Sequence, residues 1–312
     1  RLSRRQRQMC IRDRSRIMKI MGLNGSSFAP LLLGFGCSVP AILSTRRIET
    51  RSDRLVTIAV LPMMSCAGRL PIYMMFVSAL FPSRLQAPVL FGIYASGVLL
   101  ALCCARLLKN TLFKAPQRDS LHHMKRLRLP SLRKVGILMW SRAFMYVRKA
   151  GTFILGASII LWFLNTYPRP EEDTAPTNAA AMEHSYAGQI GHWMEPVTQV
   201  AGFDWKINSA LVGAFAAKEI FVTQMGILYA VEDGNSAPAA QQTLNARLKA
   251  SYTPLQGISI MIFCLIALPC IGTVTVAKRE AGTWWFALAQ FGGLTLLGFA
   301  TATLIYQAGL LL

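Results

Sequence analysis

The stretch GFGCSVPAILSTRRIETRSDRLVTIAVLPMMSCAGRLPIY, residues 34–73, decides how this chain folds. Two cysteines, Cys37 and Cys66, lie among small residues, and each has a proline close by: Pro40 follows the first and Pro62 precedes the second. Proline lacks the N–H that a helix interior needs and clashes with the preceding turn, so two apolar helices are interrupted here. At membrane depth, interrupted helices occur where they are buried in protein or line a watery cavity. The stretch therefore predicts a pair of discontinuous helices around a binding site.

The composition of the whole chain supports a membrane setting. Its 312 residues are 53% hydrophobic and only 15% charged, with a mean hydropathy of +0.40, whereas about 25% of the residues of a typical soluble domain are charged. Long apolar runs approach or exceed the roughly 20 residues that a membrane-spanning helix needs. We therefore predict an all-α fold, a polytopic α-helical integral membrane protein with discontinuous, re-entrant segments. The four longest runs are residues 85–108, 150–167, 255–276 and 284–312.

The net charge of +19 is distributed unevenly along the chain. Basic residues are concentrated in residues 1–19, 46–54 and 106–149, whereas residues 168–206 are mainly acidic. Loops rich in lysine and arginine stay in the cytoplasm, which predicts that residues 168–206 lie outside. This asymmetry accounts for the positive charge without nucleic acid, so the lipid bilayer is the expected partner.

The same patterns divide the chain into successive parts. Seven of the first sixteen residues are arginine, with no periodic apolar face, and we predict no function for this basic, unmatched segment, which is either foreign to the fold or a disordered arm. Residues 132–146 of the following basic loop have the character of an interfacial amphipathic helix. The parts are residues 1–16; residues 17–108, the first interrupted region and a membrane helix; residues 109–149, a basic cytoplasmic loop; residues 150–231, a membrane helix, an external loop and a second interrupted region; residues 232–254, a linker; and residues 255–312, the C-terminal membrane helices.

The second interrupted region, residues 208–231, contains the adjacent charges Lys218 and Glu219 within apolar sequence. Charges at membrane depth are costly and mark a pathway or a paired site. The alternative interpretation is an ion pair that only locks two helices together. If residues 168–206 are external and residues 277–283 internal, this segment enters and leaves the membrane on one side, as a re-entrant element does.

Three motifs in order carry a family resemblance. The run GLNGSSFAPLLLGFGCSVPAILSTRRIETRSDR (22–54), followed by PMMSCAGRLPIY (62–73), resembles the first Gate region of the ferrous iron transport protein B (FeoB) family. The run ALVGAFAAKEIFVTQMGILY (210–229) resembles the second Gate region of that family. The run LPCIGTVTVAKREAGTWWFAL (268–288) resembles its segment with a Pro-Cys, a Thr and a Lys-Arg-Glu. One departure is that Ala67-Gly68 is transposed relative to the usual order.

The resemblance implies a permease that imports Fe²⁺ across a bacterial inner membrane as a multi-pass protein. Members of the family also carry an N-terminal GTP-binding domain, but the chain contains no G-x-x-x-x-G-K-[ST] motif. The chain is therefore predicted to be the C-terminal permease part and not an enzyme, with GTP and Mg²⁺ bound only by the missing domain. The implied partners are that domain, small accessory proteins of the same iron-uptake system, and further copies of the chain in a homo-oligomer.

The candidate metal ligands follow from the chemistry of Fe²⁺. Fe²⁺ binds weakly among the divalent transition metals, so its selection depends on ligand softness and geometry. A transport site must also release its ion, so we expect few protein ligands. The candidates are Cys37, Cys66 and Cys270 for a thiol-lined path, Glu219 and Glu280 for charge compensation, and Ser38, Ser65 and Thr273 for oxygen ligands. The predicted structural or gating residues are Pro40, Pro62, Arg69, Pro71, Lys218 and Pro269.

Several residues also have plainer interpretations. Cysteine packs readily as a small hydrophobe, which is the interpretation favoured for Cys103, Cys104 and Cys264 on uninterrupted helices. Glu280 beside two basic residues fits an interfacial charge cluster, and Arg69 is suited to hold either the carbonyls of a broken helix or a carboxylate. Two other functions remain open. One is a nucleoside transporter of the Gate type, and the other is an inactive membrane fragment that needs a partner.

Overall fold

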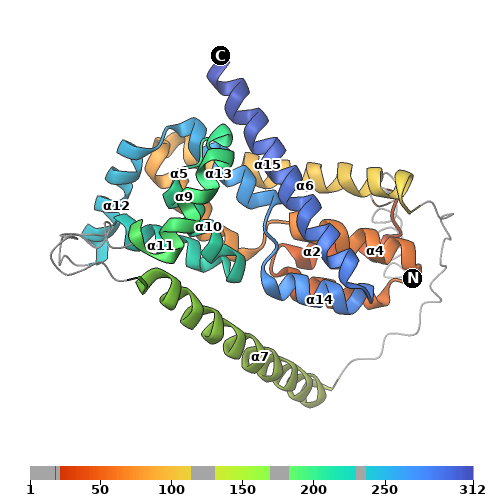
Figure 1. Cartoon of the computed structure of the whole chain (residues 1–312). Helices are drawn as coiled ribbons and strands as arrows, with labels where there is room; N and C mark the ends of the chain where they lie inside the picture. The colour runs from red at the N-terminus through yellow and green to blue at the C-terminus, as the bar shows by residue number, and fades with distance from the viewer. Residues whose placement is uncertain (1–17, 19–21, 114–130, 169–182, 230–236, 312) are drawn as a thin grey trace.

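The structure, a computed structural model, describes residues 18, 22–113, 131–168, 183–229 and 237–311 (Figure 1). These residues form helices connected by short turns and include no strand, which confirms the all-α prediction. Four helical stretches among them are long and apolar enough to cross a membrane, and each is up to 30 residues long. They are Arg51–Leu80, Ser83–Thr111, Pro254–Ala281 and Trp284–Leu311.

The first interrupted region has two breaks, as predicted. One break lies between α2 and α3, where Cys37 is the extended residue before α3. The other lies between α4 and α5, where Cys66 is the extended residue before a 3₁₀ turn. The elements are η1 (Gly25–Ser27), α2 (Phe28–Gly34), α3 (Ser38–Ser44), η2 (Thr45–Arg47), α4 (Arg51–Val60), η3 (Leu61–Met63), η4 (Ala67–Arg69) and α5 (Leu70–Leu80).

The break after α4 has a direct cause in the sequence. Pro62 has no N–H to donate to the carbonyl of Ile58, four residues earlier in the chain. Instead, Gln290 donates its side-chain amide to the Ile58 oxygen at 2.7 Å, and Gln290 is only 7% exposed. A buried carbonyl without a hydrogen-bond donor lowers the stability of the folded protein. This long-range hydrogen bond removes that cost and so stabilises the interrupted helix.

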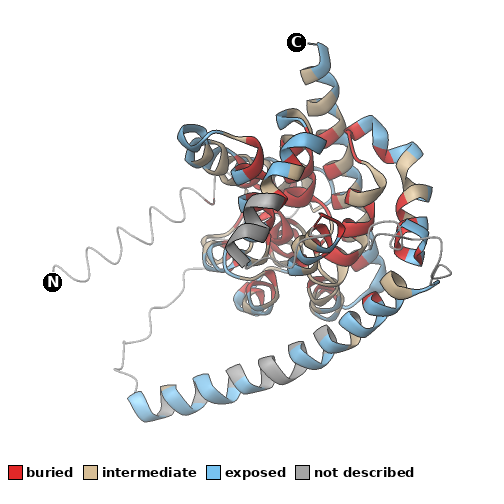
Figure 2. Ribbon diagram, turned by 90° about the vertical axis from the view of Figure 1, so that its left-hand side faces the viewer, coloured by how far each residue is buried: buried red, intermediate tan, exposed pale blue. Residues whose placement is uncertain are grey.

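A single long helix follows the basic loop, contrary to the prediction of two separate elements. We expected an interfacial helix at residues 132–146 and a membrane helix at residues 150–167, but α7 (Leu132–Thr166) runs through both without a break. No proline interrupts this segment, which explains its continuity. It packs against α9 and α10 and hydrogen-bonds to α11 through Asn165 and Gln224, and much of its length is exposed along one side of the molecule (Figures 1 and 2).

The stretch expected to be an external loop and the expected linker both contain helices. Residues 168–206 include α9 (Tyr186–Thr198) and η5 (Gln199–Ala201), and residues 232–254 include α12 (Ala237–Ser251). Gly191 explains why α9 packs closely, because a Cβ there would lie 2.5 Å from the backbone oxygen of Trp205. The chain then forms α10 (Trp205–Ala216) and α11 (Lys218–Tyr229), separated by the single extended residue Ala217.

The C-terminal region contains the third interrupted helix, as predicted near Pro269 and Cys270. A capping box of Thr253 and Gln256 begins α13 (Pro254–Ile266), and α14 (Ile271–Ala281) follows after four non-helical residues. Within this break Leu268 has a φ of 53°, in the left-handed region that side-chain-bearing residues rarely adopt. Gly282, with a φ of 85°, then ends α14 before α15 (Trp284–Leu311).

The interrupted helices lie side by side in the interior. The α14 helix packs against α3 and α15, and α13 packs against α15 and α5. In Figure 1, α5 and α9 to α13 form one group, and α2, α4 and α14 form another, with α15 and α6 (Ser83–Thr111) running across both. Buried residues gather in the interior of the helix bundle, whereas α7 and the outer helices show exposed faces (Figure 2). The break between α13 and α14 begins at the fully buried Ala267, whereas Gly36 in the break between α2 and α3 is exposed.

Candidate functional site

Chain breaks from distant parts of the sequence meet at one place, which we call the junction (residues 36–39, 62–69, 217–219 and 267–273). The N–H of Ala67 donates to the oxygen of Gly36 at 3.2 Å, so the first two breaks touch. A Cβ placed on Gly272 would lie 3.5 Å from a methyl group of Val39, so the start of α14 lies beside the start of α3. The segments that carry the three candidate cysteines are therefore brought together.

Arg69 links two of these breaks from the interior. It is 2% exposed, and its guanidinium donates to the oxygens of Pro62 at 2.7 Å, Met64 at 3.5 Å and Ala267 at 3.4 Å. Broken helices leave carbonyls without backbone partners, and the five fixed donors of arginine suit several such acceptors at once. The prediction that Arg69 holds the carbonyls of a broken helix is confirmed.

The three cysteines each lie at the start of a helical segment. Cys37 precedes α3, Cys66 precedes η4, and Cys270 precedes α14. All three thiols are partly exposed, unlike Cys264, which is buried. In the part of the chain that the structure describes, no three His, Cys, Asp or Glu side chains are arranged to hold a metal ion together. The junction is thus not a closed cage of ligands.

The candidate hydroxyl ligands have partners close to the cysteines. The sulfur of Cys270 and the hydroxyl of Thr273 are 3.2 Å apart, and Thr273 is 2% exposed. Ser65 donates to the hydroxyl of Tyr73 at 3.3 Å. Ser38 is buried as the first residue of α3. Their role as iron ligands stays a prediction.

Prolines mark where helices start as well as where they break. Pro40 is the third residue of α3, and Pro71 is the second residue of α5. An N–H at those positions would have no partner within the helix, so proline is tolerated there. Pro269 lies in the break just before Cys270. The prolines of the junction therefore set the helix ends that surround it.

Lys218 and Glu219 do not form the ion pair that their adjacency allowed. Lys218 is 5% exposed, and its ammonium nitrogen has no hydrogen-bond partner among the described residues. Glu219 is exposed and lies against Gly68, where a Cβ would come within 2.7 Å of its carboxylate. The interpretation of a satisfied pair that locks two helices is therefore wrong.

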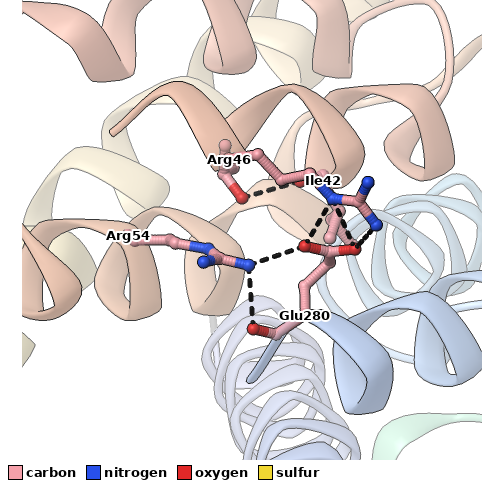
Figure 3. A network of polar contacts seen from close by, with 5 residues as sticks. Ile42, Arg46, Arg54 and Glu280 are labelled. Carbon is pink, nitrogen blue, oxygen red and sulfur yellow. Dashed lines mark hydrogen bonds and ion pairs between the residues drawn. The ribbon is translucent and has the colours of Figure 1, made fainter. Parts of the chain in front are cut away.

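Glu280 lies at the far end of α14, where it binds two arginines (Figure 3). Its carboxylate is 2.5 Å from Arg46 and 2.6 Å from Arg54, and Arg54 also donates to the Glu280 backbone oxygen at 3.0 Å. The Glu280 side chain is 3% exposed. Its charge compensates two arginines of the arginine-rich residues 46–54, which we call the basic connector, and the plainer interpretation of Glu280 as part of a charge cluster describes this position.

A second buried ion pair beside this cluster was not anticipated from the sequence. Lys109 of α6 pairs with Asp53 of α4, with exposed fractions of 8% and 2%. Lys109 also donates to Ser52 at 3.0 Å, and Thr50 donates to Asp53 at 2.7 Å. The only sequence signal was an acidic residue among the arginines of the connector. This pair and the Glu280 cluster tie the basic connector firmly to the helices on either side.

A polar network lies around the N-terminus of α10. Asp204 accepts from the N–H of Ile207 at 2.9 Å and from the hydroxyl of Tyr252 at 2.9 Å. Tyr252 in turn accepts from Tyr229 at 3.0 Å. Burial raises the pKa of Asp204 above its ordinary value, and the two hydrogen bonds only partly oppose this effect. The network joins the start of α10, the end of α11 and Tyr252, which follows α12, at the helix ends away from the junction.

The remaining cysteines and histidines lie elsewhere. Cys103 and Cys104 are on α6, and Cys103 is exposed on the helix surface. His192 stacks on Trp205 and contacts Glu195 at 3.2 Å. His122 and His123 lie outside the described residues.

Two family profiles match successive parts of the chain. The Gate family, described as nucleoside recognition, matches residues 14–80 and 147–284. The family described as ferrous iron transport protein B C terminus matches residues 90–142. Together they include the four segments that meet at the junction. No solved structure matches the chain significantly.

Curated relatives match almost the whole chain. It is 38% identical over 277 residues to the Fe(2+) transporter FeoB of Campylobacter jejuni, with 88% of this chain and 45% of the relative covered. It is 37% identical over 332 residues to a Fe(2+) transport protein A/Fe(2+) transporter FeoB fusion protein of Porphyromonas gingivalis, with 95% and 39% covered. For the Fe(2+) transporter FeoB of Helicobacter pylori the identity is 33% over 321 residues, with 94% and 50% covered. The chain thus spans half or less of the length of these relatives.

Proposed function

This chain belongs to the FeoB family, as part of its C-terminal membrane region, and from that premise we propose that it forms the membrane path along which Fe²⁺ crosses a bacterial inner membrane. The observation that carries the proposal is the meeting of the Cys37, Cys66 and Cys270 segments at one junction, where all three cysteines are partly exposed. The Cys270 segment is more than 200 residues away from the other two in the sequence. We therefore infer that the three cysteines meet for a function and do not merely pack as small apolar residues.

The geometry favours a path over a storage site. The three thiols are partly exposed, and no ready-made group of three ligands exists among the described residues. An ion that must be released again needs weak, successive contacts. In this account the sulfurs bind Fe²⁺ in turn, and hydroxyls such as that of Thr273 complete its coordination. Soft sulfur ligands favour Fe²⁺ over Mg²⁺ and Ca²⁺.

The relatives are longer than this chain, which leaves room for the GTP-binding domain that the family resemblance implies. We propose that this domain couples to the path through the basic connector, because Glu280 of α14 and Lys109 of α6 bind charged residues of the connector and anchor it to two other helices. The Porphyromonas gingivalis relative is a fusion of Fe(2+) transport protein A with a Fe(2+) transporter FeoB. This fusion supports the proposal that a small accessory protein of the same iron-uptake system is a partner of this chain.

Uptake of radiolabelled Fe²⁺ tests the proposal. The chain, joined to a related N-terminal portion, is expressed in cells that lack their own ferrous importer, and uptake is measured under reducing conditions. We expect Cys37→Ser, Cys66→Ser and Cys270→Ser each to lower uptake at least tenfold at equal membrane abundance, whereas Cys103→Ser keeps wild-type uptake. Equal transport by all variants would show that the cysteines only pack.

A second candidate function is nucleoside transport, which the description of the Gate profile favours. A nucleoside site needs buried polar groups that pair with a base or ribose, and the paired amides of Asn165 and Gln224, 2.8 Å apart, are one such group. Radiolabelled nucleoside uptake by the same cells separates the two functions. Uptake that persists in the three cysteine variants but is lost in Gln224→Leu would favour the nucleoside.

A further inference from the structure

Lys218 is an unexplained feature of the junction. It is the first residue of α11 and 5% exposed, and its ammonium nitrogen makes no hydrogen bond within the described structure. A buried ammonium without a partner is among the most costly arrangements in a protein. Such a group indicates that a negative charge belongs beside it.

A second cation, Arg69, lies near Lys218, because a Cβ on the preceding residue, Gly68, would lie 3.6 Å from the Cβ of Lys218. Arg69 uses two of its nitrogens to hold backbone carbonyls, but its third nitrogen, Nε, is buried without a partner among the described residues. Both cations therefore have a donor to spare, and they repel each other. Carbonyl oxygens carry no net charge, so the contacts of Arg69 do not relieve this repulsion.

The nearby acidic groups do not neutralise these two cations. Glu219 is the adjacent carboxylate, but it is exposed and makes no ion pair with either cation in the described structure. None of the thiols of Cys66, Cys264 and Cys270 accepts a hydrogen bond from Lys218.

Helix ends add to the positive potential at the junction. The N-terminus of α11 begins at Lys218, and that of α14 begins directly after Cys270. The first turn of an α-helix presents N–H groups without intrahelical partners, and the helix dipole places partial positive charge there. Such helix ends bind anions. Two fixed cations and two helix N-termini thus surround one small region.

We propose that the junction binds a small monovalent inorganic anion, of the halide class, between Lys218 and Arg69. Chloride meets the requirements, because a compact ion with one negative charge accepts hydrogen bonds from several directions and needs little space between packed helices. The bound anion neutralises the cations, so a divalent metal ion that approaches the cysteines meets less repulsion. Anion binding itself does not depend on which solute the protein transports.

Equilibrium binding of radiolabelled chloride to the purified full chain in detergent tests the proposal. We expect saturable binding to the wild type and at least a tenfold weaker affinity for Lys218→Met. The matched control is Lys249→Met, which removes an exposed lysine of α12 and should bind as the wild type does. Replacement of an unpaired buried ammonium by an apolar side chain of similar length leaves the fold intact.

Thermal unfolding gives a second readout that does not require the radiolabel. An anion that binds only the folded state raises the melting temperature in proportion to the logarithm of its concentration, once it is in excess. We expect sodium chloride, relative to sodium gluconate at equal ionic strength, to stabilise the wild type and Lys249→Met but not Lys218→Met. Chloride binding that is not saturable in the wild type, or that is equal in Lys218→Met, would overturn the proposal.

Fe²⁺ uptake in chloride and in gluconate media distinguishes this proposal from the proposed function. Uptake by the wild type that falls in gluconate, together with chloride binding that requires Lys218, supports a role for the anion in transport. If no saturable chloride binding is found while uptake still requires the three cysteines, the anion site is wrong and the iron path stands.

Discussion

At the scale of single residues, the structure depends on side chains that replace missing backbone hydrogen bonds. Proline and extended residues leave carbonyls without donors in the apolar interior, where an unmet acceptor is costly. Gln290 supplies the donor for Ile58, and Arg69 supplies donors for three carbonyls around the junction. A few buried polar side chains therefore stabilise the broken helices around the junction.

Replacement of Gln290 by leucine should destabilise the protein. The change leaves the Ile58 carbonyl buried without a donor, so we expect the unfolding free energy to fall by about 1–3 kcal/mol. Denaturant titration in detergent measures this loss. The matched control is Gln307→Leu on the same helix, whose amide donates to Val200 at an exposed position and should matter less. An equal loss in both variants would contradict the assigned role of Gln290.

Asp204 makes stability depend on pH in a definite direction. Burial raises the pKa of this carboxyl above its ordinary value of 3.8, so the folded state holds the proton more tightly than the unfolded state. Its contribution to stability is therefore present at low pH and is lost as pH rises from about 4 through the raised pKa. Asparagine also caps helices well, so Asp204→Asn should remove this decline without loss of the cap.

Melting temperatures between pH 4 and pH 8 test this prediction. The wild type and the control Glu219→Gln, which changes an exposed carboxylate, should decline together as pH rises, whereas Asp204→Asn should decline less. A parallel decline in all three proteins would show that burial of Asp204 does not control the pH dependence.

At the scale of elements, short parallel helices link the junction to the basic connector. The α3 helix follows Cys37 and ends near Arg46, and α14 follows Cys270 and carries Glu280 near its end. The Glu280 ion pairs thus fasten together the ends of two helices whose beginnings carry cysteines.

The two arginines of this cluster should contribute unequally. The Arg46 side chain is 55% exposed, whereas the Arg54 side chain is 29% exposed and also binds the Glu280 backbone. Water and salt screen the more exposed pair, so Arg54→Gln should lower the melting temperature more than Arg46→Gln does. Glu280→Gln should have the largest effect, because it leaves both arginines without a counter-charge. A larger effect for Arg46→Gln than for Arg54→Gln would contradict this ranking.

The sequence predicted the three interrupted helices because proline, glycine and cysteine mark them locally. It did not predict the continuous α7, or helices α9 and α12 in polar stretches. Apolar periodicity is weak in those stretches, and contacts such as Gly191 with Trp205 are visible only in three dimensions. The adjacency of Lys218 and Glu219 was likewise misleading, since neighbouring residues on a helix point in different directions.

At the scale of the whole molecule, the helices surround one junction, and the described residues include four helical stretches that are long and apolar enough to span a membrane. The segments of the junction come from both Gate regions and from the third motif, so no single part of the chain forms it. This distribution explains why the three cysteines, which are far apart in sequence, are proposed to act on the same Fe²⁺ path.

Protection of the cysteines from alkylation by Fe²⁺ tests the central claim most directly. The purified chain is treated with a maleimide without oxygen, in the presence of ascorbate, and the modified cysteines are quantified by mass spectrometry with and without Fe²⁺. We predict that Fe²⁺ slows modification of Cys37, Cys66 and Cys270 and leaves that of Cys103 unchanged, whereas Mg²⁺ protects none of them. Equal rates with and without Fe²⁺ at all three junction cysteines would contradict the account.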